Sequence, residues 1–206
     1  MTTPPTDDGR ADHYPLRRRE VVAALLAGRD DLLVVTGLGA PAWDATAAGD
    51  RDRTFPLWGA MGGALAMGLG LALARPDEPV LVLTGDGELL MGLGSLSTVG
   101  FQQPANLAVV VLDNERYGET GGQLTHTARY TDLAAVAAGC GWPSTWTVRT
   151  AADAAGLPAR LWAAPGPRLA VVKVAAANEP LVMPSRDGTW LKERFRRAVL
   201  GPDELT

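Results

Sequence analysis

Two polar side chains stand directly after apolar runs of strand length. Asp86 lies between Gly85 and Gly87 and follows the run at residues 80–84, "VLVLT", and Asn114 ends the segment "ANLAVVVLDN" at residues 105–114. Runs this apolar are typical of parallel strands that are buried on both faces. In such folds ligands bind beyond the carboxyl ends of the strands. One strand–helix–strand unit separates Asp86 from Asn114, so we expect both at the same edge of a sheet.

Side chains of this kind suit a hard divalent cation. Magnesium takes oxygen ligands in near-octahedral geometry and completes its shell with water and phosphate oxygens. Gly87 lets the backbone approach a phosphate, and a helix that begins near Glu88 presents free N–H groups and a positive dipole end. The spacing therefore predicts that Asp86 holds a cation which neutralises a bound diphosphate. Taken alone, "GDG" and "DN" are both common turn sequences.

The elements that must position these residues alternate along the chain. Expected strands cover residues 31–36, 80–84, 105–114, 144–150 and 168–174, and expected helices cover residues 15–28, 42–47, 58–75, 89–102, 131–141, 151–164 and 188–200. Short buried strands separated by helices predict an α/β fold with a doubly wound, mostly parallel sheet and helices on both faces. We expect one domain over residues 15–200.

Composition narrows the class of protein. The chain has 206 residues, of which 47% are hydrophobic and 20% charged, as in ordinary soluble globular proteins. A net charge of −4, without interleaved basic and aromatic residues, argues against a nucleic-acid partner. The single cysteine, Cys140, excludes an internal disulfide framework and a cysteine-based zinc site, and we expect a packed thiol there.

The two ends of the chain and one apolar segment indicate where in the cell the protein is expected. Residues 1–14 are polar and proline-rich, which predicts a disordered head rather than a secretory signal, and residues 201–206 form a short tail. Residues 55–74 carry no charge and are long enough to span a bilayer. Pro56, several glycines and flanks of both charge signs favour instead a wholly buried helix that starts near Trp58. We therefore expect a cytoplasmic protein without a membrane span.

The stretch "GDGELLMGLGSLSTVGFQQPANLAVVVLDNERYGETGGQ" resembles the diphosphate-binding motif of thiamine diphosphate enzymes. That motif begins with Gly-Asp-Gly and ends about this distance later in a pair of asparagines. Upstream, "WGAMGGALAMGLGLALARPDEPVLVLTGDG" is similar to the same domain, and the resemblance extends over residues 17–197. It implies that thiamine diphosphate and Mg²⁺ are the cofactors. One departure is Asp113, which replaces the first asparagine of the pair and adds negative charge near the site.

The resemblance also implies roles for individual residues. The side chains of Asp86 and Asn114 and the carbonyl of Arg116 would ligate magnesium. The other implied cofactor contacts are the backbone of Gly85, Gly87 and Glu88 around the diphosphate, the neighbouring residues Tyr117 and Gly118, the carbonyl of Gly59 at the exocyclic amine, and the side chain of Met61 beneath the cofactor.

A further implication concerns the partner. Members of the family also need a glutamate that lies in a separate pyrimidine-binding domain, and 206 residues are too few for both domains. The chain therefore resembles the diphosphate-binding subunit of a split enzyme, in a hetero-oligomer such as α2β2 with a complementary alpha subunit. "YGETGGQLTHT" and "KERFRRAVL" look most like the beta subunits of sulfopyruvate and phosphonopyruvate decarboxylases. The implied reaction is decarboxylation of a short 2-oxo acid to an aldehyde.

Other functions stay open at this point. The same cofactor would serve a carboligase, which joins the decarboxylated fragment to an acceptor. A different class is a non-catalytic or nucleotide-binding doubly wound module. For catalysis, the glycine-rich loop after Asn114 offers Glu119, Thr120 and His126. Each of these is also an ordinary residue of a solvated loop, and Arg116 and Arg129 are either contacts for an anionic substrate or surface charges.

Overall fold

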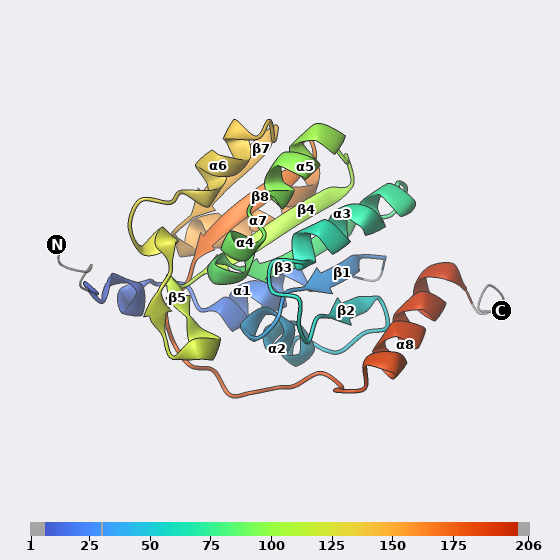
Figure 1. Cartoon of the computed structure of the whole chain (residues 1–206), viewed down its shortest axis with the longest axis horizontal. Coiled ribbons are helices and arrows are strands. Elements are labelled where there is room, and N and C mark those ends of the chain that lie inside the picture. The colour runs from blue at the N-terminus through green and yellow to red at the C-terminus, as the bar shows by residue number, and fades with distance from the viewer. Residues whose placement is uncertain (1–6, 30, 202–206) are drawn as a thin grey trace.

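The computed structural model describes residues 7–29 and 31–201. Within these ranges the largest sheet is parallel throughout and has the strand order β2-β1-β3-β4-β8-β7 (Figure 1). Its strands are β1 (Leu33–Thr36), β2 (Thr54–Pro56), β3 (Val80–Gly85), β4 (Leu107–Asp113), β7 (Ser144–Val148) and β8 (Arg168–Lys173). This confirms the predicted doubly wound α/β fold.

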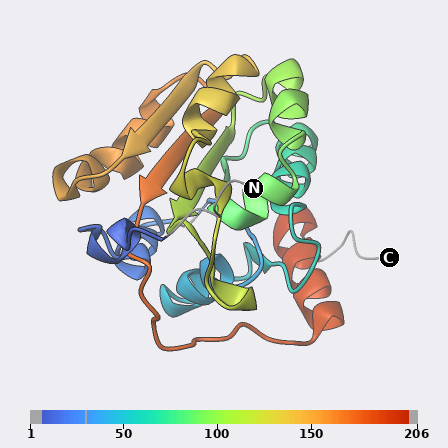
Figure 2. The same cartoon turned by 60° about the vertical axis from the view of Figure 1, so that its left-hand side comes forward.

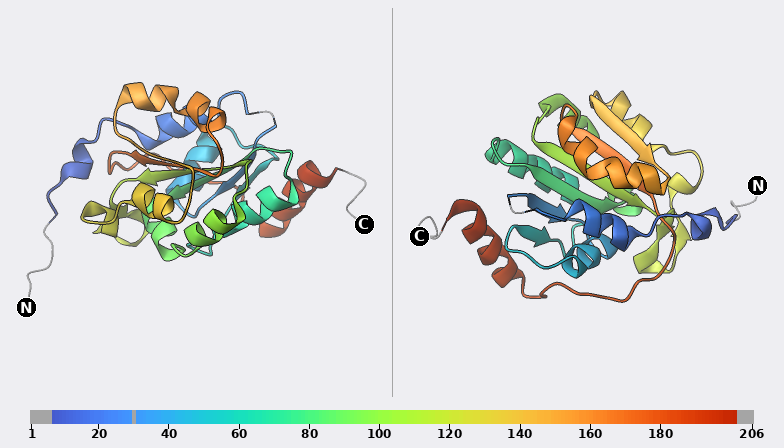
Figure 3. Two further views of the ribbon diagram at one scale, coloured as in Figure 1. Left: turned by 90° about the horizontal axis from the view of Figure 1, so that it is seen from above. Right: turned by 180° about the vertical axis from the view of Figure 1, so that it is seen from behind.

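Helices cover both faces of the sheet, as the view from above in Figure 3 shows. One face carries α3 (Ala64–Ala74), α4 (Asp86–Met91), α5 (Ser95–Gln102), α6 (Leu133–Gly139) and α8 (Gly188–Leu200). The other face carries α1 (Arg18–Leu25), α2 (Ala40–Ala47) and α7 (Ala151–Ala163). Each layer has its own hydrophobic cluster, because side chains alternate between the two faces of every strand.

The central strands β3 and β4 are neighbours, with Gly85 opposite Leu112 in the register. All seven residues of β4 are buried, so this strand is covered on both faces. Gly68 lets α3 lie close to the sheet, since a Cβ there would stand 2.1 Å from a methyl group of Val82. The two strands run in the same direction and end at one edge, which confirms the expected proximity of the segments that follow them.

Three local expectations are wrong. The helix expected to start near Trp58 begins at Ala64, and α3 is not wholly buried, because Met67 and Leu73 are 41% and 49% exposed. The helix expected over residues 89–102 is divided into α4 and α5 at Gly92–Gly94. Apolar composition indicates burial but not which face of a helix has a partner.

Three short strands were not predicted. The segment Thr54–Pro56 forms the edge strand β2, and β5 (Arg116–Tyr117) pairs antiparallel with β6 (Gln123–Leu124).

The head predicted to be disordered is ordered where the structure describes it. Residues 10–13 form a 3₁₀ helix, η1 (Arg10–His13), and Ala11 is fully buried. The amide of Ala176 donates to the carbonyl of Ala11 at 3.0 Å, which ties this segment to the chain after β8. In Figure 2 that later chain runs from β8 below the sheet to α8. The prediction is therefore wrong for residues 7–14, while residues 1–6 and 202–206 lie outside the described residues.

Two smaller expectations concern the membrane and the thiol. Among the described residues, no helix has both the length and the apolar content needed to cross a membrane. Cys140 is a free, partly buried thiol that packs against the cluster beneath α6. That packing agrees with the expected core position of Cys140.

Candidate functional site

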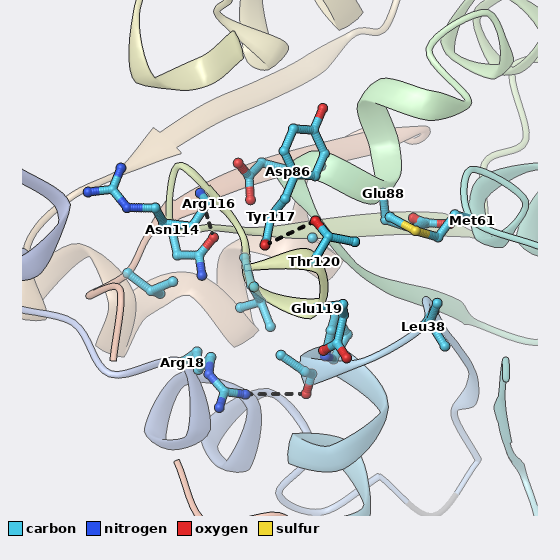
Figure 4. Close-up of a pocket in the computed structure, with 17 residues that line it drawn as sticks. Arg18, Leu38, Met61, Asp86, Glu88, Asn114, Arg116, Tyr117, Glu119 and Thr120 are labelled. Carbon is cyan, nitrogen blue, oxygen red and sulfur yellow. Dashed lines mark hydrogen bonds between the residues drawn. The ribbon is translucent and has the colours of Figure 1, made fainter. Parts of the chain in front are cut away.

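A pocket opens beyond the carboxyl ends of β3 and β4 (Figure 4). Of the residues singled out in the sequence, it is lined by Met61, Gly85, Asp86, Gly87, Glu88, Asn114, Arg116, Tyr117, Gly118, Glu119 and Thr120. These residues come from the turn before α3, the β3–α4 junction and the segment after β4. The fold thus brings almost the whole predicted set together at one edge of the sheet.

Asp86 is the first residue of α4 and is only 1% exposed. Its carboxylate accepts hydrogen bonds from the hydroxyls of Thr125 and Thr127, the latter at 3.1 Å. Burial and, second, the nearby carboxylate of Asp113 outweigh the opposing effect of the two hydroxyls, and together these effects raise the pKa of Asp86 to about 7. Among the described residues no ion pair is formed by Asp86, so its charge lacks the compensation that a buried carboxylate needs.

The residues after β4 form a tight turn over residues 114–117, which we call the metal-binding turn after the role that the sequence predicts for it. The Asn114 side-chain oxygen accepts the amide of Arg116 at 3.0 Å. Between them, Glu115 has a left-handed backbone with φ 60°, a conformation that costs a residue with a Cβ about 1–2 kcal/mol. The Arg116 guanidinium pairs with Asp7 at 2.7 Å, so its charge is already engaged.

Glu115 is 1% exposed, yet its carboxylate is fully paired. Arg10 donates through Nε and Nη2, both at 2.9 Å, and Tyr14 and Lys173 donate at 2.8 Å. Burial would raise the pKa of Glu115, but these hydrogen bonds outweigh it and lower the pKa to about 2. Lys173 also pairs with Asp113 at 2.7 Å. No sequence pattern pointed to this cluster.

Gly87 stands where the pocket needs close approach to the backbone. A Cβ at this position would lie 2.5 Å from the ring of Tyr117, so only glycine fits beneath that ring. The first turn of α4 carries N–H groups that no carbonyl of the same helix accepts. This part of the pocket is suited to the oxygens of a phosphate group.

Glu88 supports the turn that carries Met61. Its carboxylate accepts the amides of Gly62 at 2.9 Å and Ala64 at 3.2 Å, and it also accepts the hydroxyl of Thr84. Met61 is thereby held at the pocket wall, on the side away from Asn114 in Figure 4. The sequence analysis assigned only the backbone of Glu88 to the site, whereas in the structure its side chain also stabilises the turn that carries Met61.

Glu119 and Thr120 lie where a loop passes over the pocket. The Glu119 carboxylate rests against Gly39, where a Cβ would stand 2.4 Å from it. Burial raises the pKa of Glu119, and the nearby charge of Arg18 opposes that effect. Arg18 also lines the pocket and bonds Asp44 at 2.6 Å. Sequence reasoning missed Arg18, which looked like an ordinary helix residue.

Three predicted residues lie elsewhere. Gly59 is exposed and does not line the pocket. His126 is also exposed and lies outside it, although the adjacent Thr125 and Thr127 both reach Asp86. Arg129 lines a separate hollow near Lys173. At the start of the 3₁₀ helix η3 (His126–Ala128), Thr125 and Thr127 therefore face the site while His126 is exposed.

The sequence matches the family described as "Thiamine pyrophosphate enzyme, C-terminal TPP binding domain" over residues 45–174, more than half of the chain. The chain belongs to this family. Its members are named for binding thiamine pyrophosphate, which is thiamine diphosphate. The matched range contains Met61, Asp86 and the metal-binding turn, and hence nearly all of the pocket.

Several curated relatives of this TPP-binding domain are decarboxylases by name. Sulfopyruvate decarboxylase subunit beta from Methanocaldococcus jannaschii is 47% identical over 53% of this chain and 57% of its own. Phosphonopyruvate decarboxylase from Streptomyces viridochromogenes is 37% identical over 94% of this chain and 49% of its own. The chain thus spans about half the length of these two relatives. In contrast, sulfopyruvate decarboxylase subunit beta from Methanothermobacter thermautotrophicus is 38% identical over 92% of this chain and 98% of its own.

Solved structures agree on the fold of this TPP-binding domain. Benzoylformate decarboxylase from Polynucleobacter necessarius aligns with a TM-score of 0.66 at 20% sequence identity. The alignment covers 87% of this chain and 36% of the other. At this identity the likeness concerns the arrangement of helices and strands.

The residues present fit thiamine diphosphate with a divalent cation. Asp86 offers a buried carboxylate without an ion-pair partner among the described residues, and Asn114 offers an amide oxygen in the same pocket. Both are hard ligands of the kind that magnesium prefers. Gly87 lets the Tyr117 ring lie against the backbone of α4, whose first turn has free N–H groups suited to a phosphate.

Proposed function

We propose that this chain is the diphosphate- and magnesium-binding subunit of a thiamine diphosphate-dependent decarboxylase that acts on a short 2-oxo acid. The observation that carries the proposal is the pocket, where an uncompensated buried carboxylate, Asp86, adjoins the metal-binding turn. The reaction class is supported by the relative from M. thermautotrophicus, which is matched over 98% of its length.

Each pocket residue has a proposed task. Asp86, the side chain of Asn114 and the carbonyl of Arg116 hold Mg²⁺. The backbone of Gly85, Gly87 and Glu88 receives the diphosphate, and Tyr117 and Gly118 close that side of the pocket. Met61 supports the cofactor from the opposite wall. The role predicted for the Gly59 carbonyl, as acceptor for the cofactor's amine, stays a prediction, since Gly59 does not line the pocket. When bound, the cofactor supplies the electron sink that lets carbon dioxide leave the substrate.

The chain's own acid–base groups lie in the loop over the pocket. Glu119 is the proposed acid–base group near the substrate, because its side chain lines the pocket and partial burial raises the pKa of Glu119 above its ordinary value. Thr120 is its polar neighbour, whose hydroxyl bonds Gln123 at 3.0 Å. The catalytic role that the sequence suggested for His126 stays a prediction without geometric support.

The proposed partner is a complementary alpha subunit that carries the pyrimidine-binding domain and its glutamate. Two relatives matched over 98% of their length are named as beta subunits, which supports this division of labour. The proposed substrates are 2-oxo acids with a second anionic group, such as sulfopyruvate or phosphonopyruvate. An assembly such as α2β2 and a cytoplasmic location remain predictions from the sequence.

Calorimetry tests cofactor binding. Thiamine diphosphate is titrated into the protein with and without Mg²⁺, and ATP with Mg²⁺ serves as the control ligand. We expect weak, magnesium-dependent binding of thiamine diphosphate and no binding of ATP. Preference for ATP would support a nucleotide-binding module and contradict the proposal.

Reconstitution tests the reaction. The purified chain alone is expected to release no carbon dioxide from either acid, since the activating glutamate is contributed by the partner. Addition of the alpha subunit should produce decarboxylation and tighter cofactor binding through linkage of the two binding events. Robust turnover by the single chain would contradict the split-enzyme proposal, and a carbon–carbon coupled product would indicate a carboligase.

A further inference from the structure

The metal-binding turn is connected to the N-terminal end of the described chain. Arg10 bonds both carboxylate oxygens of Glu115, and Tyr14 bonds one of them. Glu115 is the central residue of the turn, flanked by Asn114 and Arg116, which the proposed function assigns to the metal. We call residues 10–14 the N-terminal clasp. Residues 15–113 of the chain separate it from the turn.

The clasp holds both sides of the site. Besides Glu115, Arg10 donates to the carbonyls of Thr127 at 3.3 Å and Ala128 at 2.7 Å. Thr127 in turn donates from its hydroxyl to Asp86 and to Asp113. A single guanidinium therefore joins the turn that carries Asn114 to the segment that contacts Asp86.

Glu115 needs such support because of its backbone. It has φ 60°, its side chain is 1% exposed, and its carbonyl accepts the amide of Thr125 at 3.0 Å. A left-handed residue other than glycine persists only where its surroundings hold it. A buried carboxylate likewise persists only where it is paired. Both conditions are met by Arg10 and Tyr14 together with Lys173.

We propose that the N-terminal clasp positions the metal-binding turn, with Arg10 and Glu115 as positioning residues that hold Asn114 and the Arg116 carbonyl ready for Mg²⁺. The clasp itself is anchored independently of the turn, because Ala11 is fully buried and its carbonyl accepts the amide of Ala176. It can therefore act as a fixed support. This inference rests on the proposed function, since it concerns the same metal site.

The first experiment uses the protein without metal. In the double variant Arg10→Ala/Tyr14→Phe, hydrogen exchange at the amides of Glu115 and Thr125 should accelerate by about tenfold or more, because these amides depend on the closed turn. Exchange in β4 should stay unchanged. Arg17→Ala is the matched control, since Arg17 is an exposed arginine just beyond the clasp. Wild-type exchange rates in the double variant would overturn the proposal.

The second experiment measures the Mg²⁺ concentration that gives half-maximal binding of thiamine diphosphate, together with the unfolding temperature. In the double variant we expect the Mg²⁺ midpoint to rise by about tenfold, as for groups that orient metal ligands, with recovery at saturating Mg²⁺ at a temperature where the variant is fully folded. Glu115→Gln should raise the midpoint similarly, and combining it with Arg10→Ala should add little further.

The outcomes separate this inference from the proposed function. An unchanged midpoint in a wild-type protein that does bind would overturn the positioning role. A loss of binding that parallels a fall in melting temperature would also overturn it, because the clasp would then support only the fold. If the wild-type chain binds no thiamine diphosphate even with its partner, the proposed function fails, and the exchange experiment still decides whether the clasp holds the turn.

Discussion

Asp86 and Glu115 are two carboxylates at the same edge of the sheet, and each is 1% exposed. Their surroundings differ in charge. Glu115 has Arg10, Lys173 and Tyr14 around it, and these partners overcome burial and lower its pKa to about 2. Among the described residues, Asp86 has two threonine hydroxyls and no cationic side chain paired with it, and burial together with Asp113 raises its pKa to about 7. At equal burial, the neighbouring charges therefore distinguish a carboxylate that the chain itself compensates, Glu115, from one that is open to the proposed cation, Asp86.

The largest expected difference between the two is in stability without metal. Glu115→Ala should lower the free energy of unfolding by about 3 kcal/mol, because it removes the carboxylate that accepts from Arg10 and Tyr14 and leaves the buried Lys173 paired with Asp113 alone. Asp86→Asn should be neutral or stabilising, since it removes an uncompensated charge. Chemical denaturation at pH 8 with a chelator provides the measurement. Similar losses in both variants would remove the distinction.

For cofactor binding we expect the opposite order, with the larger loss in the Asp86 variant. Asp86→Asn is expected to weaken magnesium-dependent binding of thiamine diphosphate by more than about 100-fold, beyond the effect of residues that only orient a ligand. Asn114→Ala should also abolish the magnesium dependence while the fold survives, because both residues lie after strand ends. Asp77→Asn, at an exposed aspartate, is the control. Retained magnesium-dependent affinity in either site variant, measured by calorimetry, would exclude the ligand assignment.

The pH dependence of the metal-free protein should show opposite signs for the two groups. The folded pKa of Asp86 is raised to about 7, so its contribution to stability is present at low pH and is lost as pH rises from about 4 to 7. The folded pKa of Glu115 is lowered to about 2, so its contribution is present above about pH 4.5 and is lost as pH falls toward 2.

At about 1.4 kcal/mol per unit of pKa, each change should be on the order of 3–4 kcal/mol. Thermal unfolding from pH 2 to 8 measures both windows. In Asp86→Asn the upper window should vanish while the lower one remains, and in Glu115→Gln the reverse should hold. A variant that alters both windows equally would show that the two carboxylates titrate as one group.

The smallest effect concerns the apolar wall opposite these carboxylates. Met61→Ala should lower the decarboxylation rate of the assembled enzyme by about tenfold, and it should change stability by less than about 1 kcal/mol, since Met61 is only partly buried. Met67→Ala is the matched control, because Met67 lies in α3 outside the pocket and is 41% exposed. A large stability loss with unchanged turnover would assign Met61 to the core.

Local sequence patterns predicted much of the fold and the central residues of the site. The apolar runs at residues 80–84 and 105–114 placed β3 and β4, and the motif placed Asp86 and Asn114 at their ends. The short strands β2, β5 and β6 were missed, because two or three residues leave no periodicity to read. Thr125 and Thr127 were also missed, since threonine in a polar loop carries no signal for a buried contact.

The sequence by itself determined the class of fold and the kind of ligand, because strand length, alternation with helices and hard oxygen donors after glycine are local properties. Only the tertiary structure decided which carboxylate is neutralised and which is left for a cation. That choice depends on charges distant along the chain: Arg10 lies 105 residues and Lys173 58 residues from Glu115. The amino-acid composition could not show which carboxylate is paired. A cation stabilises a buried carboxylate only when the two lie within a few ångströms, and two such residues can be any distance apart in the sequence.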